Sequence, residues 1–269
     1  MTSKRFHSVV YPTDLSGSGL DAFSHALRLA TLFNGTLHIL HTGPNSGSES
    51  GTTVWDNFPK VHETLSRWGV KSEPASSLKI VKAEIESSDP VHGVTFYVEK
   101  HPCDLLVMWT HVRSGFAHWL KESTAESIAH NIGAPTLYLT EGKRGFVDAQ
   151  TGALSLQTVL LPIDANLPCK KAWLWLSDFL RTVAPHAKLH LLHVGSEVPP
   201  TAREFEDAIE IREGPVVQTI IEAADELRAD MIAMPTKAQG GLLGALRGSV
   251  TSKVLDHAPC PVLAIPAAQ

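Results

Sequence analysis

The chain has 269 residues, a length that favours two domains over one. Apolar residues make up 43% and charged residues 19% of the chain, and the net charge is −5, which argues against a disordered, fibrous or generally nucleic-acid-binding protein. We find no run of about 18 apolar residues that would predict a membrane span, and no apolar core of a signal peptide near the N-terminus. Three scattered cysteines without a CxxC pair favour the reducing cytoplasm.

The first half opens with two predicted strands and a helix between them. The run VVYPTD at residues 9–14 predicts the first strand, and LHILHTG at residues 37–43 predicts the second. Between them, apolar residues recur at helical spacing over residues 23–30. The pair Asn34-Gly35 then predicts a left-handed helix end.

Two more helices and two more strands follow in the first half. One helix is indicated by four apolar residues at helical spacing: Phe58, Val61, Leu65 and Trp68. The other begins at Asp89-Pro90, a capping residue followed by a first-turn proline. The uninterrupted runs DLLVM at residues 104–108 and APTLYL at residues 134–139 predict buried strands.

The second half repeats these runs in the same order. The matching runs are VLLPID at residues 159–164, LHLLHVG at 189–195, DMIAM at 230–234 and CPVLAI at 260–265. Four ordered matches indicate two homologous domains. We place them at residues 1–145 and 154–269, on either side of a short polar stretch that contains glycine.

The alternation of apolar runs and helical stripes predicts an α/β fold in each half. Alternating strands and helices imply a parallel sheet with helices on both faces, so we expect two tandem doubly wound domains. Ligands of such sheets bind outside the carboxyl ends of the strands, at the switch point in strand order. Asp14 and Asp164 stand at the ends of the two first strands.

The second half is shorter than the first between its second and third strands. The first half holds the Phe58-to-Trp68 helix in this region, so we expect the second domain to lack that helix. A sheet face left bare there would need another cover, and a partner domain or subunit is the natural candidate. Trp175 and Phe179, four residues apart on a predicted helix, are expected to cover core or a domain interface.

A glycine-rich stretch follows the DMIAM run. Residues 235–252 read PTKAQGGLLGALRGSVTS and lead into a predicted helix. Glycines let the backbone approach a ligand, and the amides of a helix N-terminus favour an anion. The same residues also fit an ordinary capped turn, and the stretch is neither a P-loop nor a dinucleotide fingerprint. Local chemistry alone therefore leaves phosphate binding open.

The whole chain resembles a tandem universal stress protein. The resemblance rests on three segments: LPID at residues 161–164, LHLLHV at 189–194, and residues 234–262, which end in LDHAPCPV. The resemblance implies a five-stranded parallel sheet in each domain, in the order 3-2-1-4-5, with helices on both sides. It also implies that nucleotide-binding relatives hold ATP with an aspartate after strand one and the pattern G-x2-G-x9-G-[ST] after strand four.

Carried onto the second domain, this pattern predicts a site for ATP or a related adenine nucleotide, with or without Mg. Pro235 and Ala238 replace the first two glycines, and proline offers no amide. Gly248 and Ser249 match the end of the pattern, and Asp164 is expected on the base or ribose side. The predicted site consists of Asp164, Val194, Thr236, Ala238, Gly248, Ser249, Val250 and Thr251.

The first domain departs further from the pattern. Its three glycine positions are occupied by Trp109, Val112 and Glu122, which leaves Asp14, Ser123 and Thr124. Glu122 would place a negative charge where the triphosphate lies, so we expect no ATP binding of the family kind here. Trp109 and the loop aromatics are interpreted as filling a collapsed pocket or an interface, with a changed ligand as the alternative: His111, Phe116, His118 and Trp119.

These patterns favour a cytoplasmic stress-response protein that binds an adenine nucleotide in its second domain only. The alternative is an interaction or scaffold protein in which both pockets are degenerate. We assign no catalytic residue, because no nucleophile elbow occurs, and slow ATP hydrolysis is a weaker option. No metal site is assigned either, because paired strand histidines three apart point to opposite faces. Protein partners stay unspecified, a homodimer through the last strands is open, and neither nucleic acid nor membrane is expected.

Overall fold

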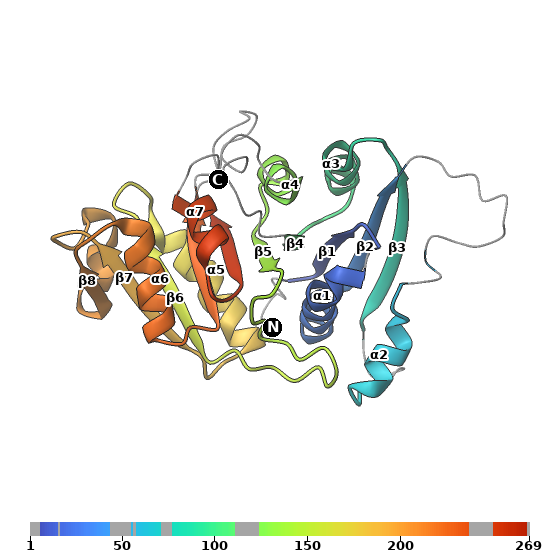
Figure 1. Ribbon diagram of the computed structural model, residues 1–269, viewed down its shortest axis with the longest axis horizontal. Helices are drawn as coiled ribbons and strands as arrows, with labels where there is room; N and C mark the ends of the chain where they lie inside the picture. Colours follow the sequence, from blue (N-terminus) through green and yellow to red (C-terminus); the bar gives the residue numbers. More distant parts are fainter. Residues whose placement is uncertain are drawn as a thin grey trace.

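The computed structural model describes residues 6–15, 17–43, 55, 58–70, 77–110, 124–236 and 250–267 (Figure 1). Five parallel strands form in the first half: β1 (Ser8–Thr13), β2 (Thr36–Gly43), β3 (Lys79–Glu86), β4 (Leu105–Thr110) and β5 (Thr136–Thr140). Their helices are η1 (Gly17–Gly19), α1 (Leu20–Phe33), α2 (Val61–Arg67), α3 (Pro90–Lys100) and α4 (Thr124–Ile132). The strand order in this half is β3-β2-β1-β4-β5.

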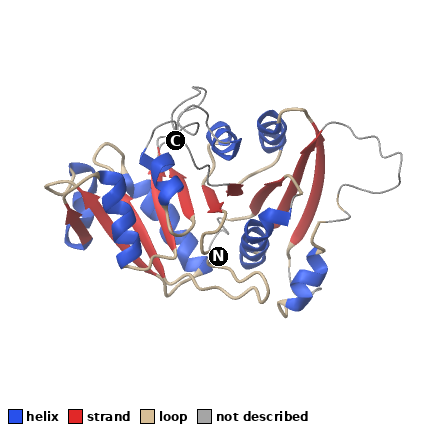
Figure 2. Ribbon diagram, viewed as in Figure 1, coloured by secondary structure: helices blue, strands red, loops and turns tan. Residues whose placement is uncertain are grey.

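The second half repeats this arrangement. Its strands are β6 (Thr158–Ile163), β7 (Lys188–Val194), β8 (Ile209–Arg212), β9 (Met231–Thr236) and β10 (Val262–Pro266). Its helices are α5 (Cys169–Val183), the 3₁₀ helix η3 (Pro200–Ala208), α6 (Val216–Glu226) and α7 (Val250–His257). The order β8-β7-β6-β9-β10 mirrors the first half. The predicted α/β fold, with parallel strands and helices on both faces, is confirmed (Figure 2).

The two halves join edge to edge through their last strands. β5 and β10 pair in antiparallel fashion, with Leu137 opposite Leu263, which produces one ten-stranded sheet. The pairing of last strands is thus satisfied within one chain. Because the two strands run in opposite directions, the carboxyl ends of the strands in the two halves lie at opposite edges of the sheet. Any ligand crevices of the two halves are therefore separate.

The helices form two layers, one on each face of the sheet, and each layer contains helices from both halves. α1 and α5 pack side by side on one face, whereas α3, α4, α6 and α7 cover the other. On the α1 face, the Phe6 ring lies 4.9 Å from the Phe33 ring and 5.2 Å from the Trp175 ring. Phe179 is fully buried beside them, so the expectation that Trp175 and Phe179 cover a core or domain interface is confirmed.

The shortened connection between β7 and β8 contains a 3₁₀ helix. The Phe205 ring of η3 lies 5.1 Å from Trp173 on α5, much as Phe58 lies 5.0 Å from Phe23 on α1. Residues 195–208 are described throughout and hold no α-helix, as expected. A partner domain or subunit is the natural candidate to cover this face, but the structure places η3 there, with the Phe205 ring against Trp173 of α5.

Matching aspartates attach the first strand of each half to the strand beside it. Asp104 Oδ2 accepts the backbone N–H groups of His7 and Ser8, at 2.7 and 2.9 Å. Asp230 Oδ2 accepts those of Gln157 and Thr158, at 2.8 and 2.9 Å. The aspartate that opens each DLLVM-type run is thus a structural residue. It satisfies amides at the start of a strand that would otherwise be left without acceptors.

Residues 141–157, which connect β5 to β6, are packed against the first half. Phe146 is buried, and Val147 forms an isolated antiparallel bridge with Leu154. The Trp68 indole N–H donates to the carbonyl of Ala149 at 3.2 Å. This connection is therefore part of the core rather than a loose linker. Among the described helices, none is both long and apolar enough to cross a membrane.

Candidate functional site

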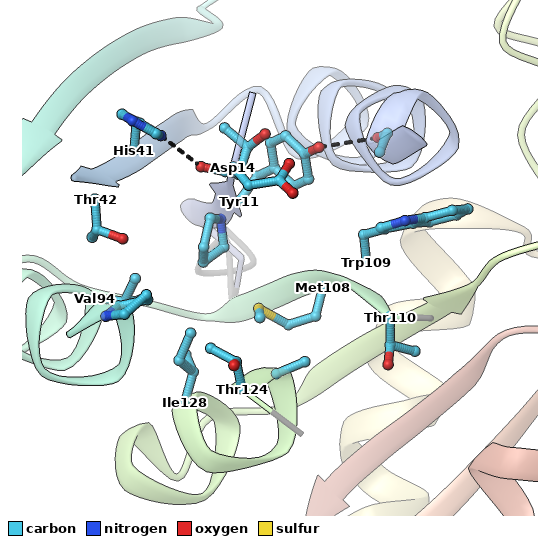
Figure 3. Close-up of a pocket in the computed structure, with 15 residues that line it drawn as sticks. Tyr11, Asp14, His41, Thr42, Val94, Met108, Trp109, Thr110, Thr124 and Ile128 are labelled. Atoms are coloured by element: carbon cyan, nitrogen blue, oxygen red, sulfur yellow. Dashed lines mark hydrogen bonds between the residues drawn. The ribbon is translucent and has the colours of Figure 1, made fainter. Parts of the chain in front are cut away.

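A cavity of about 340 Å³ opens at the carboxyl ends of the strands in the first half (Figure 3). It is bounded by β1, β2 and β4 and covered by residues of α3 and α4. β1 pairs with β2 on one side and with β4 on the other, so the cavity lies where the strand order reverses. This is the position at which open parallel sheets bind ligands.

The floor of the cavity is apolar. Met108 rises from β4, Val94 faces it from α3, and Ala125 and Ile128 face it from α4. All four side chains are buried. They belong to the apolar core on the α3 and α4 face, so the cavity is an opening in that core rather than a surface dent.

The rim of the cavity is built by the turn that follows β1. Thr13 Oγ1 accepts the N–H of Leu15 at 3.0 Å, and Leu15 adopts a left-handed φ of +63°. This turn leaves Asp14 exposed at the mouth of the cavity. His41 Nδ1 lies 3.0 Å from the Thr13 carbonyl oxygen and is the donor, since a carbonyl can only accept a hydrogen bond. This bond holds the end of β1 against β2.

Tyr11 closes the cavity on the α1 side. Its hydroxyl donates to the carbonyl of Gly19 at 3.0 Å, and burial raises its pKa to about 12. A Cβ at position 19 would lie 2.7 Å from the Tyr11 hydroxyl oxygen, so this contact requires glycine. Tyr11 is therefore a neutral, fixed wall of the cavity.

Trp109 stands at the end of β4 and also borders the cavity, next to Thr110. Its side chain is half-buried. The interpretation that Trp109 and the loop aromatics fill a collapsed pocket or an interface stays a prediction, while Trp109 itself borders the cavity. The other positions of that prediction lie outside the described residues: His111, Val112, Phe116, His118, Trp119, Glu122 and Ser123.

The predicted site of the second half is described in part. Asp164 follows β6, Val194 ends β7 and Thr236 ends β9. Since β7 and β9 flank β6, these residues share one edge of the sheet. Val250 and Thr251 open α7. Ala238, Gly248 and Ser249 lie outside the described residues.

The details of this edge mirror the first half. Asp164 is exposed, and its Oδ1 accepts the N–H of Asn166 at 2.7 Å. His193 Nδ1 donates to the carbonyl of Ile163 at 2.9 Å, just as His41 does to Thr13. From the sequence we consider the strand histidines only as metal ligands and assign them no other role. The signal in the sequence is that both halves repeat the histidine. In each half it bonds the backbone carbonyl just before the aspartate and so holds that strand end in place.

Metal binding and thiol chemistry find no support in the part of the chain that the structure describes. No group of three or more His, Cys, Asp or Glu residues there could hold a metal ion. The three cysteines are free. Burial raises the pKa of the Cys103 and Cys260 thiols to about 12, so both stay protonated near neutral pH.

Two doubly wound α/β units, each with an exposed aspartate after its first strand, define the class of this protein. The profile of the universal stress protein family matches residues 5–139 and 201–266. The chain belongs to the universal stress protein family, and its two matched stretches make it a tandem member.

Relatives and solved structures agree with this placement. A universal stress protein of Methanocaldococcus jannaschii is 26% identical over an alignment of 156 residues, and the match covers 52% of this chain and 85% of the relative. One from Synechocystis sp. is 28% identical over an alignment of 141 residues, and the match covers 43% of this chain and 88% of the relative. The crystal structure of a universal stress protein from Archaeoglobus fulgidus covers 97% of both chains, with a TM-score of 0.68 and 19% identity. This structural likeness shows the shared fold.

Proposed function

We propose that this universal stress protein acts in the cytoplasm and binds an adenine nucleotide such as ATP in its second domain only. The observation that carries the proposal is the convergence of Asp164, Val194 and Thr236 at one sheet edge, at the switch point beside β6. Free thiols at all three cysteines support a reducing compartment.

The residues of this edge suit an adenine nucleotide in chemical terms. The exposed carboxylate of Asp164 can accept hydrogen bonds from ribose hydroxyls. The first turn of α7 offers backbone N–H groups and a favourable dipole to phosphate oxygens, and Thr251 adds a hydroxyl to the same turn. Gly248 and Ser249, which precede α7 in the sequence, complete the expected phosphate contacts. The phosphate oxygens of a bound nucleotide would carry the negative charge that binds Mg²⁺.

The test is to denature the purified chain and identify the released small molecules by mass spectrometry. We expect about one adenine nucleotide per chain, and a higher melting temperature with added Mg-ATP, because a ligand that binds only the native state stabilises it. Gly248→Glu should abolish both effects, since it introduces the residue that the first domain carries at the equivalent position, Glu122. Circular dichroism would show that the variant still folds.

The control is Ser123→Ala in the first domain, which should release as much nucleotide as the wild type. Retained nucleotide in Gly248→Glu would show that the site assignment is wrong. Two nucleotides per chain would show that the first domain also binds, against the proposal. No released nucleotide and no thermal shift would overturn nucleotide binding altogether.

The second candidate is an interaction protein that binds no nucleotide. One observation favours it: Pro235 lies inside β9, opposite Ile265, where the family pattern has a glycine. Proline has no N–H to offer a phosphate at this position. In this case both halves would retain the fold for binding other proteins, and the nucleotide experiments would all be negative.

A further inference from the structure

An apolar groove of about 430 Å³ lies on the α5 face of the second half, between α5, η3 and β7. All of its lining belongs to residues 173–208, a stretch that the structure describes without a gap. Five apolar residues of the lining are only half-buried: Trp173, Ala184, Ala187, Leu189 and Phe205. The groove therefore leaves hydrocarbon and aromatic surface open to water, which is unfavourable unless something covers it.

The first half buries the residues at the equivalent positions. Leu37 holds the place in β2 that Leu189 holds in β7, since both lie opposite the same position of the neighbouring first strand. Leu37 is 0% exposed, whereas Leu189 is half-buried. Phe23 on α1 is 1% exposed, whereas Trp173, at the matching position of α5, is half-buried. The same surface is thus covered in one half and partly bare in the other.

The difference follows from α2, which has no counterpart in the second half. Val61 and Leu65 of α2 are buried in the same apolar core as Leu37. η3 replaces only part of this cover, because it brings Phe205 to α5 but residues 195–208 contain no α-helix. β7 and β8 lie at the opposite end of the molecule from α2 (Figure 1). The groove is therefore the remaining part of a seat that a helix fills in the first half.

α2 indicates the chemistry of an occupant that fits such a seat. Its buried residues Val61 and Leu65 are four positions apart, so they lie on one face of the helix. Arg181 lines the groove at its rim, with its side chain 74% exposed and its guanidinium paired with Asp178 on the same helix. This cation would attract a carboxylate on the flank of the occupant. α2 carries such a carboxylate, Glu63, in its first turn.

We propose that this groove binds an amphipathic helix of a partner protein, with aliphatic residues four positions apart and an acidic flank. The helix adds to the layer in which α1 and α5 already pack side by side, and it takes on the second half the place that α2 has on the first. Binding of this kind buries the apolar face of the partner helix in the groove. Leu189 lies near the start of β7 and Val194 at its end, so the groove is separate from the proposed nucleotide site.

The probe is a fluorescent peptide with the sequence of residues 58–70, titrated with the full chain by fluorescence anisotropy. Because short peptides are rarely helical in water, a hydrocarbon staple joins positions 62 and 66, which are both exposed on α2. We expect the peptide to bind. A second peptide with Val61→Ser and Leu65→Ser should bind at least about tenfold more weakly, because it loses the apolar surface that the groove buries.

Ala208→Glu in the full chain tests whether the peptide binds in the groove. Ala208 is exposed and lines the groove, so the new carboxylate enters the apolar seat without removing a core residue. We expect at least about a tenfold loss of peptide affinity and an unchanged melting temperature. Ala153→Glu makes the same change at an exposed alanine outside the groove and should bind as the wild type does. The indole N–H resonance of Trp173 should shift during the titration.

Three results would overturn the proposal. They are no binding of the stapled peptide at millimolar concentrations, equal affinity of the two peptides, and unchanged affinity in Ala208→Glu, which would mean that the peptide replaces α2 in the first half. Self-association of the chain that is lost in Ala208→Glu, measured by sedimentation, would also overturn it, because a second copy would then fill the groove. Nucleotide release from the Gly248→Glu variant is measured separately, so either proposal can fail without the other.

Discussion

At the scale of single residues, His25 joins α1 to the segment between the two halves. Its Nδ1 donates to the Asp21 carbonyl at 2.7 Å, and its Nε2 accepts the N–H groups of Phe146 at 2.9 Å and Val147 at 3.1 Å. Two donors point at Nε2, so this nitrogen must carry a lone pair. Burial lowers the pKa of His25 to about 4, and the ring stays neutral in the folded chain.

The neutral state of His25 predicts a loss of stability in mild acid. The unfolded chain protonates this histidine below pH about 6.5, whereas the folded chain resists protonation until pH about 4. Its contribution is therefore complete above pH 6.5 and is lost as the pH falls towards 4. We expect the free energy of unfolding to drop by about 2 kcal/mol from this group between pH 7 and pH 5.

Urea titrations at pH 7 and pH 5 measure this effect, with His25→Gln as the comparison. The variant should be less stable at pH 7, because it loses the double acceptor for the two amides, but its stability should depend less on pH. The same pH dependence in both proteins would contradict the role assigned to His25.

At the scale of elements, Asp230 shows how a side chain ties the starts of neighbouring strands together. Besides the two amides at the start of β6, it pairs through Oδ1 with Arg144 at 3.1 Å, and it is buried. Asp230→Ala would leave two backbone N–H groups without an acceptor. We expect a loss of about 2–3 kcal/mol in the free energy of unfolding, the usual penalty for such groups.

Denaturant unfolding tests this expectation, with two comparison variants. Asp104→Ala should show a similar loss because it removes the matching contacts to His7 and Ser8. Asp207→Ala, an exposed aspartate on η3, should change stability by no more than about 0.5 kcal/mol. If Asp230→Ala behaved like Asp207→Ala, the structural role of the repeated aspartate would be wrong.

At the scale of the whole molecule, the β5–β10 junction and the aromatic cluster connect the two halves through one sheet and a shared core. Phe6 precedes β1 in the first half, yet its ring contacts Trp175 and Phe179 of α5. We expect one cooperative unfolding transition for the full chain. Phe6→Ala should lower its stability by about 3–5 kcal/mol, because it empties space in a shared core.

Hydrogen exchange during denaturant unfolding would show whether the halves move together. Amides of β1–β5 and β6–β10 should lose protection at the same denaturant concentration. Phe6→Ala should lower this concentration by the same amount for both sets of amides. Phe96→Ala is the control, since Phe96 is 46% exposed on α3. A shift confined to the first half would show that the domains unfold independently.

Much of the fold was predictable because its signals are local. The repeated apolar runs mark buried strands, and helical spacing marks the helices between them, so the α/β class follows from residues near one another in the chain. Asp14 and Asp164 could be placed at strand ends by the same reasoning. The cavity could not be predicted, since it depends on how Met108, Val94 and Ile128 from three separate elements pack around open space.

The amino-acid sequence by itself determined the doubled α/β architecture and the family, because both are written in short patterns that recur along the chain. Only the tertiary structure decided that β5 pairs with β10, that η3 packs in the shortened second half, and that Trp109 borders a cavity. It also revealed that His25 accepts hydrogen bonds from the backbone N–H groups of two residues more than a hundred positions away. These features arise from contacts between distant segments, and no local pattern encodes which distant segments will meet.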